Sequence, residues 1–150
     1  MIDRQWIGFA TAPSTIAIDR WHVRLFCRAI GETNAVHWDE AAARDAGLAA
    51  CPVPPTFLKA IETEHFTSAA LLRKVGVPVR SVLHAEPNFD YLAPVHVGDV
   101  LEVSRTVADA FDKRGGALSF IVVDTHFRRV EATVCTSRQT IVVRNRQEIE

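Results

Sequence analysis

The second half of the chain is a nearly continuous series of strand-forming segments, and no other feature limits the possible folds more. In residues 99–109, apolar side chains at positions 101, 103 and 107 alternate with polar ones at 102, 104 and 106. This period of two is typical of a strand with one buried face. Turn-forming sequences at 97–99, 112–116 and 128–131 separate the segments. The sequence therefore predicts consecutive antiparallel strands over residues 81–95, 99–109, 117–127 and 131–144.

The first half predicts an extended segment and two short helices. Residues 8–18 are apolar with scattered Thr and Ser, as in a strand or an extended arm. Asp19 suits a helix N-cap, because its short carboxylate can accept from a free amide of the first turn, and Gly31 suits the C-terminal end of that helix. A second helix is expected over residues 40–46, capped by Asp39. The apolar residues at helical spacing in the first helix are Trp21, Leu25, Phe26 and Ala29.

A long central helix is predicted to follow. The prolines at 52, 54 and 55 exclude a helix interior, but Pro55 suits a first helical turn, where its missing N–H costs nothing. One stripe at helical spacing then continues toward Gly76, made up of Leu58, Ile61, His65, Ala69 and Leu72. His65 is interpreted as a core or rim histidine. Helices before a run of antiparallel strands indicate a single α+β domain over residues 1–150, with one sheet covering the principal helix.

Composition excludes several classes of protein. Hydrophobic residues make up 48% and charged residues 23%, as in globular proteins, and the net charge of −1 lacks the basic excess of a nucleic-acid-binding surface. Neither a signal peptide nor an apolar stretch of about 20 residues is found, so no membrane contact is expected. Three widely spaced cysteines without a CxxC pattern predict free thiols and no metal site, in a protein of the reducing cytoplasm.

The residues that point to chemistry lie in the loop after the first helix. Glu32 and His37 are five positions apart, directly after the helix stop at Gly31. A carboxylate and a neutral imidazole are the two groups most used to move a proton at neutral pH. Such a pair also arises by chance, with the glutamate in solvent and the histidine packed in a loop, so the surrounding sequence has to decide.

The surrounding sequence resembles the MaoC-like acyl dehydratases, the group that contains the (R)-specific enoyl-CoA hydratases. That family carries a loop of the form G-D-x-N-P-x-H-x-D before a helix of small residues, and residues 31–39 of this chain are GETNAVHWD. The Pro-Pro-Thr-Phe sequence at 54–57 and the strand from His84 to Tyr91 are similar to the N-terminal-type MaoC dehydratases. The resemblance extends from Ile7 to about Arg144, although no role beyond packing is assigned to His84, Glu86 or Tyr91.

The resemblance implies a hot-dog fold, in which an antiparallel sheet wraps a long central helix, and a homodimer or a heterodimer with another MaoC-like chain. The implied reaction is reversible hydration of a 2-enoyl thioester, carried on coenzyme A or acyl carrier protein, with no other cofactor. His37 would activate the water, while Glu32 would orient it and exchange a proton at the α-carbon. Asn34 would fix the loop, the amide of Thr56 would stabilise the enolate oxygen, and the acyl chain would lie beside Phe57.

Three departures from the hydratase motif stand within these positions. The acid is Glu32 where the hydratases have Asp, which adds one methylene, Ala35 replaces a proline, and Thr56 replaces a glycine. A misplacement of about 1 Å can cost around a hundredfold in rate, so the first departure matters most. The basic side chains of the helical region either meet coenzyme A phosphates or form a solvated face; they are Lys59, Arg73, Lys74 and Arg80.

Two alternative functions remain open at this point. The chain could be a non-catalytic subunit that binds the acyl chain while a partner MaoC-like chain performs the reaction. It could also be a hot-dog thioesterase, in which a carboxylate of the central helix, Glu62 or Glu64, would serve. Both glutamates lie off the apolar stripe and are expected to be solvated, and a thioesterase would leave the Glu32–His37 loop unexplained.

Overall fold

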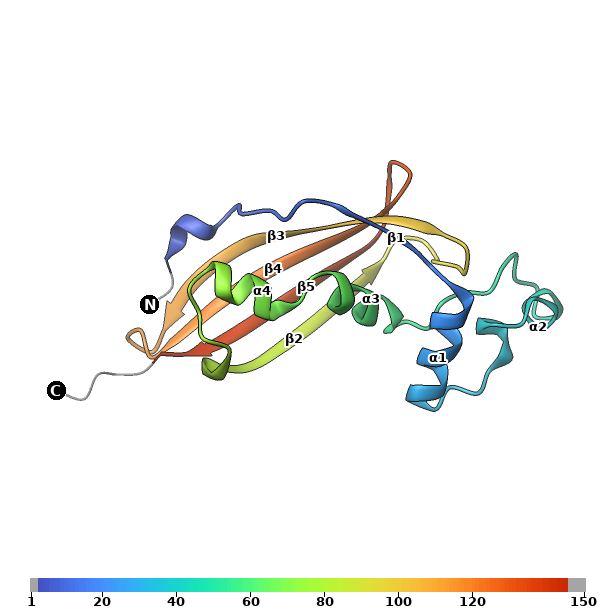
Figure 1. Cartoon of the computed structure of the whole chain (residues 1–150), viewed down its shortest axis with the longest axis horizontal. Helices are drawn as coiled ribbons and strands as arrows, with labels where there is room; N and C mark the ends of the chain where they lie inside the picture. Colours follow the sequence, from blue (N-terminus) through green and yellow to red (C-terminus); the bar gives the residue numbers. More distant parts are fainter. Residues whose placement is uncertain (1–2, 146–150) are drawn as a thin grey trace.

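A long, curled antiparallel sheet forms the body of the molecule, and two helical segments lie over one of its faces (Figure 1). The computed structural model describes residues 3–145, except for the side chains of residues 84–86. None of the helices in this range has the length and apolarity needed to cross a membrane. In chain order the elements are β1 Ser14–Ala17, α1 Arg20–Ile30, α2 Glu40–Asp45, α3 Phe57–His65, α4 Ser68–Lys74, β2 Val82–Tyr91, β3 Val100–Lys113, β4 Leu118–Arg129 and β5 Ala132–Arg144, with short 3-10 turns at Arg4–Trp6, Ala35–His37 and Val79–Ser81.

The strand order is β1-β3-β4-β5-β2, with every pair antiparallel. The N-terminal arm extends the β1 edge, because Gly8 N–H donates to Val107 O at 2.8 Å and Thr11 N–H to Arg105 O at 2.9 Å. The α+β architecture expected from the sequence is confirmed, including the four consecutive long strands. The helices α1 and α2 lie beyond one end of the sheet, so the loop between them projects from that end (Figure 1).

The central helix is interrupted, and the prediction of one continuous stripe was wrong in this respect. Phe66 leaves helical geometry at φ −132° and ψ 80°, and Thr67 starts α4 by accepting from Ala70 N–H through its hydroxyl. Arg105 Nη1 donates to the freed carbonyl of Phe66 at 2.7 Å, which places a cation at the negative end of α3. The hydrogen bond lost where the helix breaks is thereby replaced by one from the side chain of Arg105 on β3.

Helix α1 begins and ends as predicted, but its buried face is not the one that the stripe indicated. Asp19 accepts from Trp21 N–H at 2.7 Å, and Gly31 takes the left-handed conformation at φ 74°. The buried residues are Val23 and Cys27, whereas Trp21 is 65% exposed and Leu25 50%. Trp21 and Leu25 therefore lie on the solvent side of α1 and not against the sheet.

A polar layer divides the core into two apolar clusters. The cluster under α1 and the start of α3 includes Phe57 and Phe127, and the cluster under α4 includes Leu72 and Ile141. Between them, one row across the inner face of the sheet is formed by paired residues of β3, β4 and β5. This row and the groups that face it, here called the polar belt, consist of Arg105, Thr125, Ser137, Gln139, Glu62 and Lys59.

Candidate active site

Glu32 is positioned by the way in which α1 ends. The N–H of Gly31 bonds to Arg28 O and the N–H of Glu32 bonds to Cys27 O at 2.8 Å, which together form a Schellman motif. A residue with a side chain in place of Gly31 would be strained at φ 74°. The direction in which the chain leaves α1 is therefore fixed, and the backbone of Glu32, the first residue after Gly31, is fixed with it.

The carboxylate of Glu32 is held within its own loop. Asn34 N–H donates to Oε1 at 2.8 Å, and the side chain of Asn34 accepts from Val36 N–H at 3.2 Å, which caps the 3-10 turn. Asn34 thus fixes the backbone, as expected. The hydrogen bond from the Asn34 amide has the largest effect on the pKa of Glu32 and lowers it below the ordinary value of 4.5. Burial raises this pKa by a smaller amount. The Thr33 amide and the nearby charge of His37 lower it further.

We expect the carboxyl carbon of Glu32 to titrate below the ordinary glutamate value of 4.5 in a ¹³C-detected NMR titration. Hydrogen bonds from amides favour the ionised form, so as the pH falls this carboxylate keeps its charge after an ordinary one has lost it. A Glu32 midpoint at or above 4.5 would contradict the hydrogen-bonded geometry of the loop.

His37 is held in one tautomer by the chain segment before α3. Its Nδ1 lies 2.7 Å from Pro52 O, and because a carbonyl can only accept, Nδ1 carries the proton. Nε2 is then the unprotonated nitrogen, and it has no hydrogen-bond partner among residues 3–145. A half-buried imidazole with a fixed tautomer and a free Nε2 is suited to act as a general base.

The start of α3 supplies a free backbone donor. Thr56 is the N-cap residue, its side chain makes no capping bond, and its own N–H donates to no acceptor within the described range. The hydroxyl of Tyr91 donates to the carbonyl oxygen of Pro55, which belongs to the same peptide group as that N–H. A hydrogen bond to a carbonyl polarises its peptide and strengthens the N–H as a donor. Tyr91 is a candidate site residue that sequence reasoning did not select, because its partner is a backbone atom 36 positions away.

The same segment borders a small hollow. Its volume is about 180 Å³, and it is lined by Pro52, Val53, Pro55, Tyr91, Pro94 and Val95. Desolvation raises the pKa of Tyr91, which therefore stays a neutral donor at any physiological pH. Phe57, predicted to contact an acyl chain, is 1% exposed. Its ring packs edge-on against the ring of Phe26, with 5.5 Å between the two ring centroids. In this arrangement its ring belongs to the core, and its contact with a substrate stays a prediction.

The two central-helix glutamates have opposite environments, and the expectation that both are solvated was wrong for Glu62. Its side chain is buried, Thr125 Oγ1 donates to it at 2.8 Å, and Arg105 Nε lies 3.3 Å away. Lys59 Nζ donates to Glu62 at 3.0 Å, so its ammonium is turned toward this buried carboxylate although the side chain remains 28% exposed. A carboxylate that is fully engaged by two cations is poorly placed to act as a thioesterase base, whereas Glu64 is exposed as predicted.

The remaining predicted residues lie apart from the Glu32–His37 loop. His65 is an exposed rim residue, 3.5 Å from the hydroxyl of Ser14, and Arg73, Lys74 and Arg80 are exposed. The side chains of His84 and Glu86 lie outside the described atoms. Within residues 3–145, no cluster of three or more His, Cys, Asp or Glu side chains could hold a metal ion. The three cysteines are buried free thiols, as expected: Cys27, Cys51 and Cys135.

Three chemical groups suited to one reaction lie toward one end of the sheet. A carboxylate with a lowered pKa and an imidazole with a free Nε2 share one loop, and the imidazole is anchored to the segment that ends at the Thr56 amide. A reaction at the carbon atoms beside a thioester carbonyl requires two things: a group that transfers a proton, and a backbone donor that stabilises the developing oxyanion.

Comparison with known proteins gives a family and a fold. The model of the FAS1-like, dehydratase domain region matches residues 5–137. A UPF0336 protein of Streptomyces griseus is 30% identical over 149 residues, which cover 98% of each chain. A UPF0336 protein of Clavibacter michiganensis is 34% identical over 136 residues, or 89% of each chain.

Solved structures agree with this result. A C-terminally truncated HadBC (3R-hydroxyacyl-ACP dehydratase) complex from Mycobacterium tuberculosis has a TM-score of 0.76 at 21% identity, covering 91% of this chain and 96% of the other. A MaoC-like dehydratase has a TM-score of 0.74 at 25% identity, with coverage of 97% and 44%. The R-hydratase PhaJ1 from Pseudomonas aeruginosa has a TM-score of 0.64 at 19% identity, with coverage of 96% and 87%. The hot-dog fold and the resemblance to MaoC-like dehydratases are both confirmed.

Proposed function

The chain belongs to the family of the FAS1-like dehydratase domain region, and from that premise we propose that it catalyses the reversible hydration of 2-enoyl thioesters. The substrate would be carried on coenzyme A or acyl carrier protein, and no cofactor beyond this carrier would take part. The observation that carries the proposal is the Glu32–His37 loop, in which a fixed tautomer leaves Nε2 of His37 free beside an ionised carboxylate.

The two side chains divide the proton transfers. In the dehydration direction, the Glu32 carboxylate takes the proton from the α-carbon, and the protonated Nε2 of His37 gives its proton to the departing β-hydroxyl, which leaves as water. Hydration reverses both transfers: His37 accepts a proton from the attacking water, and Glu32, which carries a proton in this direction, gives it to the α-carbon. The lowered pKa of Glu32 favours its ionised form, which is the form that accepts the α-proton in dehydration.

The enolate formed at the thioester oxygen would be stabilised by the Thr56 amide. Negative charge that develops at the N-terminus of α3 is favoured by the free N–H and by the helix dipole. Pro55 has no N–H, so the donor in this segment is the amide that Tyr91 polarises through the Pro55 carbonyl. Tyr91 thus acts as a positioning residue for the amide.

A second chain of the same fold is proposed as the partner. The β2 strand pairs with β5 on one side only, so its other edge can accept a strand, and α1 presents Trp21 and Leu25 to solvent. The HadBC neighbour is itself a complex of hot-dog chains. Either a second copy of this chain or a different MaoC-like chain could cover these surfaces. With a different chain as the partner, this chain could also be the non-catalytic subunit of the pair.

The proposal is tested by adding purified protein to trans-2-enoyl-CoA substrates of several chain lengths and following the loss of the enoyl-thioester absorbance. Formation of the 3-hydroxyacyl product by the chain alone supports the proposal. Release of free thiol would identify a thioesterase instead. Activity that arises only with a second MaoC-like chain, and survives loss of Glu32 and His37 here, would assign the chemistry to the partner.

Tyr91→Phe is expected to lower kcat for hydration by about fivefold, the effect of one lost hydrogen bond of about 1 kcal/mol, with KM changed much less. The enolate exists only near the transition state, so weakening its donor affects kcat before it affects substrate binding. A matched control is Phe89→Leu, because Phe89 stacks on Tyr91 at 6.3 Å but makes no hydrogen bond to the Pro55 carbonyl. An equal loss of kcat in both variants would show that Tyr91 acts through packing and not through its hydrogen bond to the Pro55 carbonyl.

A further inference from the structure

A hollow of about 410 Å³ lies at the end of the sheet where β2 begins. It is bounded by the turn after α4, by the 3-10 turn Val79–Ser81 and by the residues where β4 starts and β5 ends. The wall on the β4 side is fixed, because Asn145 Nδ2 donates to Gly116 O and to Ser119 Oγ, both at 2.7 Å. The volume lies within the range of small-molecule sites.

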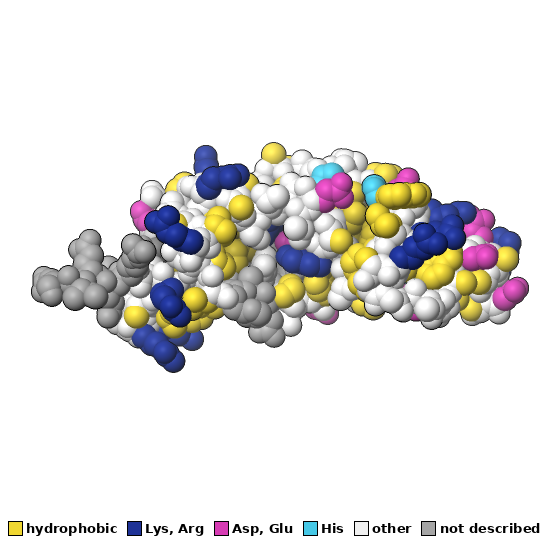
Figure 2. Space-filling model, turned by 60° about the horizontal axis from the view of Figure 1, so that its bottom comes forward, with side chains coloured by type: hydrophobic (Ala, Val, Ile, Leu, Met, Phe, Trp, Pro, Cys, Tyr) yellow, Lys and Arg dark blue, Asp and Glu magenta, His cyan; other side chains and the backbone are white. Residues whose placement is uncertain are grey.

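The charged side chains of this hollow favour an anion. Arg80, from the 3-10 turn, and Arg144, the last residue of β5, are both exposed, and within residues 3–145 neither forms an ion pair. Asp3 is the one acid among the described lining residues, and both of its carboxylate oxygens accept from Gln5, at 2.9 and 2.6 Å. Figure 2 shows Lys and Arg side chains gathered at this end of the molecule.

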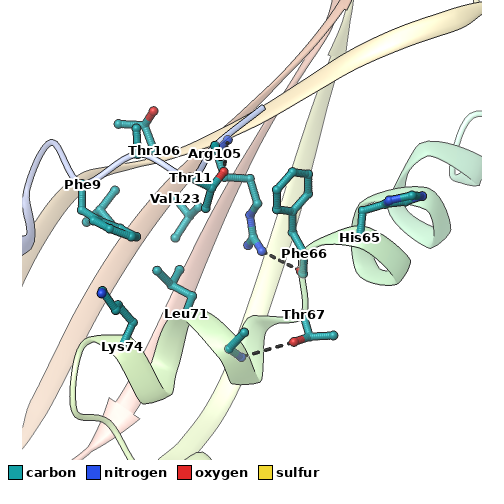
Figure 3. A pocket seen from close by; sticks show the side chains of 14 residues that line it. Phe9, Thr11, His65, Phe66, Thr67, Leu71, Lys74, Arg105, Thr106 and Val123 are labelled. Atoms are coloured by element: carbon teal, nitrogen blue, oxygen red, sulfur yellow. Dashed lines mark hydrogen bonds between the residues drawn. The ribbon is translucent and has the colours of Figure 1, made fainter. Parts of the chain in front are cut away.

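The cavity of about 420 Å³ at the junction of α3 and α4 differs in this respect. Its buried cation, Arg105, donates to the carbonyl oxygen of Phe66 (Figure 3) and is paired with Glu62, so its charge is already engaged within the protein. An anion would gain more at the start of β2, because an exposed guanidinium without a carboxylate partner has N–H donors to spare.

Exposed apolar side chains mark both ends of β2. Val79 is 54% exposed and Leu83 47% at its start, and Leu92, directly after its last residue, is 62% exposed. The edge between them is open, because within residues 3–145 β2 pairs only with β5. Single apolar residues in solvent are ordinary, but a set that flanks one open strand edge indicates a surface that a second chain covers.

A second copy of this chain fits this edge. A two-fold axis perpendicular to the sheet pairs the two β2 strands antiparallel and keeps the helices of both copies on one face. With the ten residues of each strand aligned, the start of β2 in one copy lies beside the end of β2 in the other. Leu83 then lies near Leu92 of the partner subunit, so the exposed side chains at the two ends cover each other.

The same pairing brings the hollow to the active site of the second copy. Tyr91, which polarises the peptide of the Thr56 amide, is the last residue of β2, whereas Arg80 precedes the first. We propose that Arg80 and Arg144 of one copy bind phosphate groups of the carrier whose acyl thioester lies in the active site of the other. A guanidinium binds phosphate through paired N–H donors, and two arginines on different elements can take two separate phosphate groups. The inference rests on the proposed function and names the part of the site that the partner supplies.

Phosphate esters occur both in coenzyme A and in the phosphopantetheine arm of acyl carrier protein, so substrates with one acyl group separate the two sources. Crotonyl-pantetheine has no phosphate, crotonyl-4′-phosphopantetheine has the one that both carriers share, and crotonyl-CoA has the nucleotide phosphates as well. A KM effect that is already present with the single phosphate assigns the contact to the shared arm. An effect seen only with crotonyl-CoA assigns it to the nucleotide end.

Arg80→Gln should raise KM for crotonyl-CoA about three- to fivefold, and together with Arg144→Gln about tenfold, with kcat within about twofold of wild type. A contact far from the reacting atoms is made equally in the ground state and the transition state, so its loss appears in KM. KM for crotonyl-pantetheine should not change, and Arg73→Gln, on α4 but outside the lining, should change neither value. An unchanged KM for crotonyl-CoA in the double variant, or an equal rise with crotonyl-pantetheine, would overturn the proposal.

Mixed dimers show which copy supplies the arginine. In a dimer of His37→Ala with Arg80→Gln, the only site with an intact His37 lies beside the intact Arg80 of the other copy, so KM for crotonyl-CoA should equal that of wild type. In a dimer of wild type with His37→Ala/Arg80→Gln, the only site with an intact His37 faces the substituted position, so KM should rise. The reverse pattern would place Arg80 at the active site of its own chain and contradict the proposal, as would a monomer in light scattering.

Binding of coenzyme A, measured by isothermal titration calorimetry, needs no turnover and separates this inference from the proposed function. We expect Arg80→Gln/Arg144→Gln to bind coenzyme A about tenfold more weakly than wild type at an unchanged Tm, since both side chains are exposed. Weaker binding by this variant of a chain that hydrates nothing would refute catalysis and keep the phosphate site. Equal affinity in variant and wild type would refute the phosphate site, whether or not the chain hydrates enoyl thioesters.

Discussion

His37→Ala is expected to lower kcat/KM for enoyl-thioester hydration by about 10²–10⁴-fold, the usual contribution of a positioned general acid or base. The substitution removes the free Nε2 that accepts a proton from water, and also the hydrogen bond between Nδ1 and Pro52 O that holds the segment before Thr56. Glu32→Gln, which keeps the shape but not the base, should cause a loss of similar size. The measurement is steady-state hydration kinetics of each purified variant.

Matched controls separate chemistry from folding. His22→Ala changes an exposed histidine of α1, and Glu64→Gln changes an exposed glutamate of α3, so both should retain wild-type kinetics. Because the pair acts as a unit, the double variant should lose little more than either single variant. Losses that multiply in the double variant would show that the two side chains act independently, whereas rates that stay within twofold of wild type would remove Glu32 and His37 from the mechanism.

Glu62→Gln is expected to destabilise the protein by about 3–5 kcal/mol, the cost of removing one partner from a buried ion pair. Arg105 would stay buried without a counter-charge while Lys59 could turn to solvent, since Lys59 is 28% exposed and Arg105 only 3%. Burial already lowers the pKa of Arg105, and Glu62 opposes that shift, so losing the carboxylate lowers this pKa further. The free energy of unfolding in urea provides the measurement.

Two further variants define the origin of that loss. Glu64→Gln, half a turn away on α3 but exposed, should change the free energy of unfolding by less than about 0.5 kcal/mol. Glu62→Leu combined with Arg105→Met removes both buried charges and should be less destabilised than Glu62→Gln, because the remaining charge, on Lys59, can turn to solvent. A double variant less stable than the single one would show that the pair contributes through its contacts and not through charge balance.

The strands and helix ends were predictable because their signals are local. The alternation in β3 marks its buried face, and Asp19, Gly31 and Asp39 bound the first helices through contacts within a few residues. The break at Phe66 was not predictable, since it is stabilised by Arg105 from a strand 39 positions later. The buried face of α1 was misjudged for a related reason: helical spacing alone does not say which side meets the sheet.

The candidate site divides in the same way. Glu32 and His37 were selected from one loop, and the cap by Asn34 is a contact within that loop. The burial of Glu62 and the role of Tyr91 depend on Thr125, Arg105 and the Pro55 carbonyl, which only the folded sheet brings within reach. A charged residue off the apolar stripe normally lies in solvent, and only a cation on the facing strand reverses that expectation.

The polar belt also determines which strand alignments are possible. Alternation of apolar and polar residues prevents a slip by one position, because that would turn every core side chain to solvent. A slip by two positions keeps the alternation, and in an all-apolar core it would cost little. Here it would move Arg105 away from Thr125 and Glu62 and place its charge against Val123 or Phe127. The ion pair between Glu62 of α3 and Arg105 of β3 therefore helps to specify the strand register, because it favours the native pairing of β3 with β4 over alignments shifted by two residues.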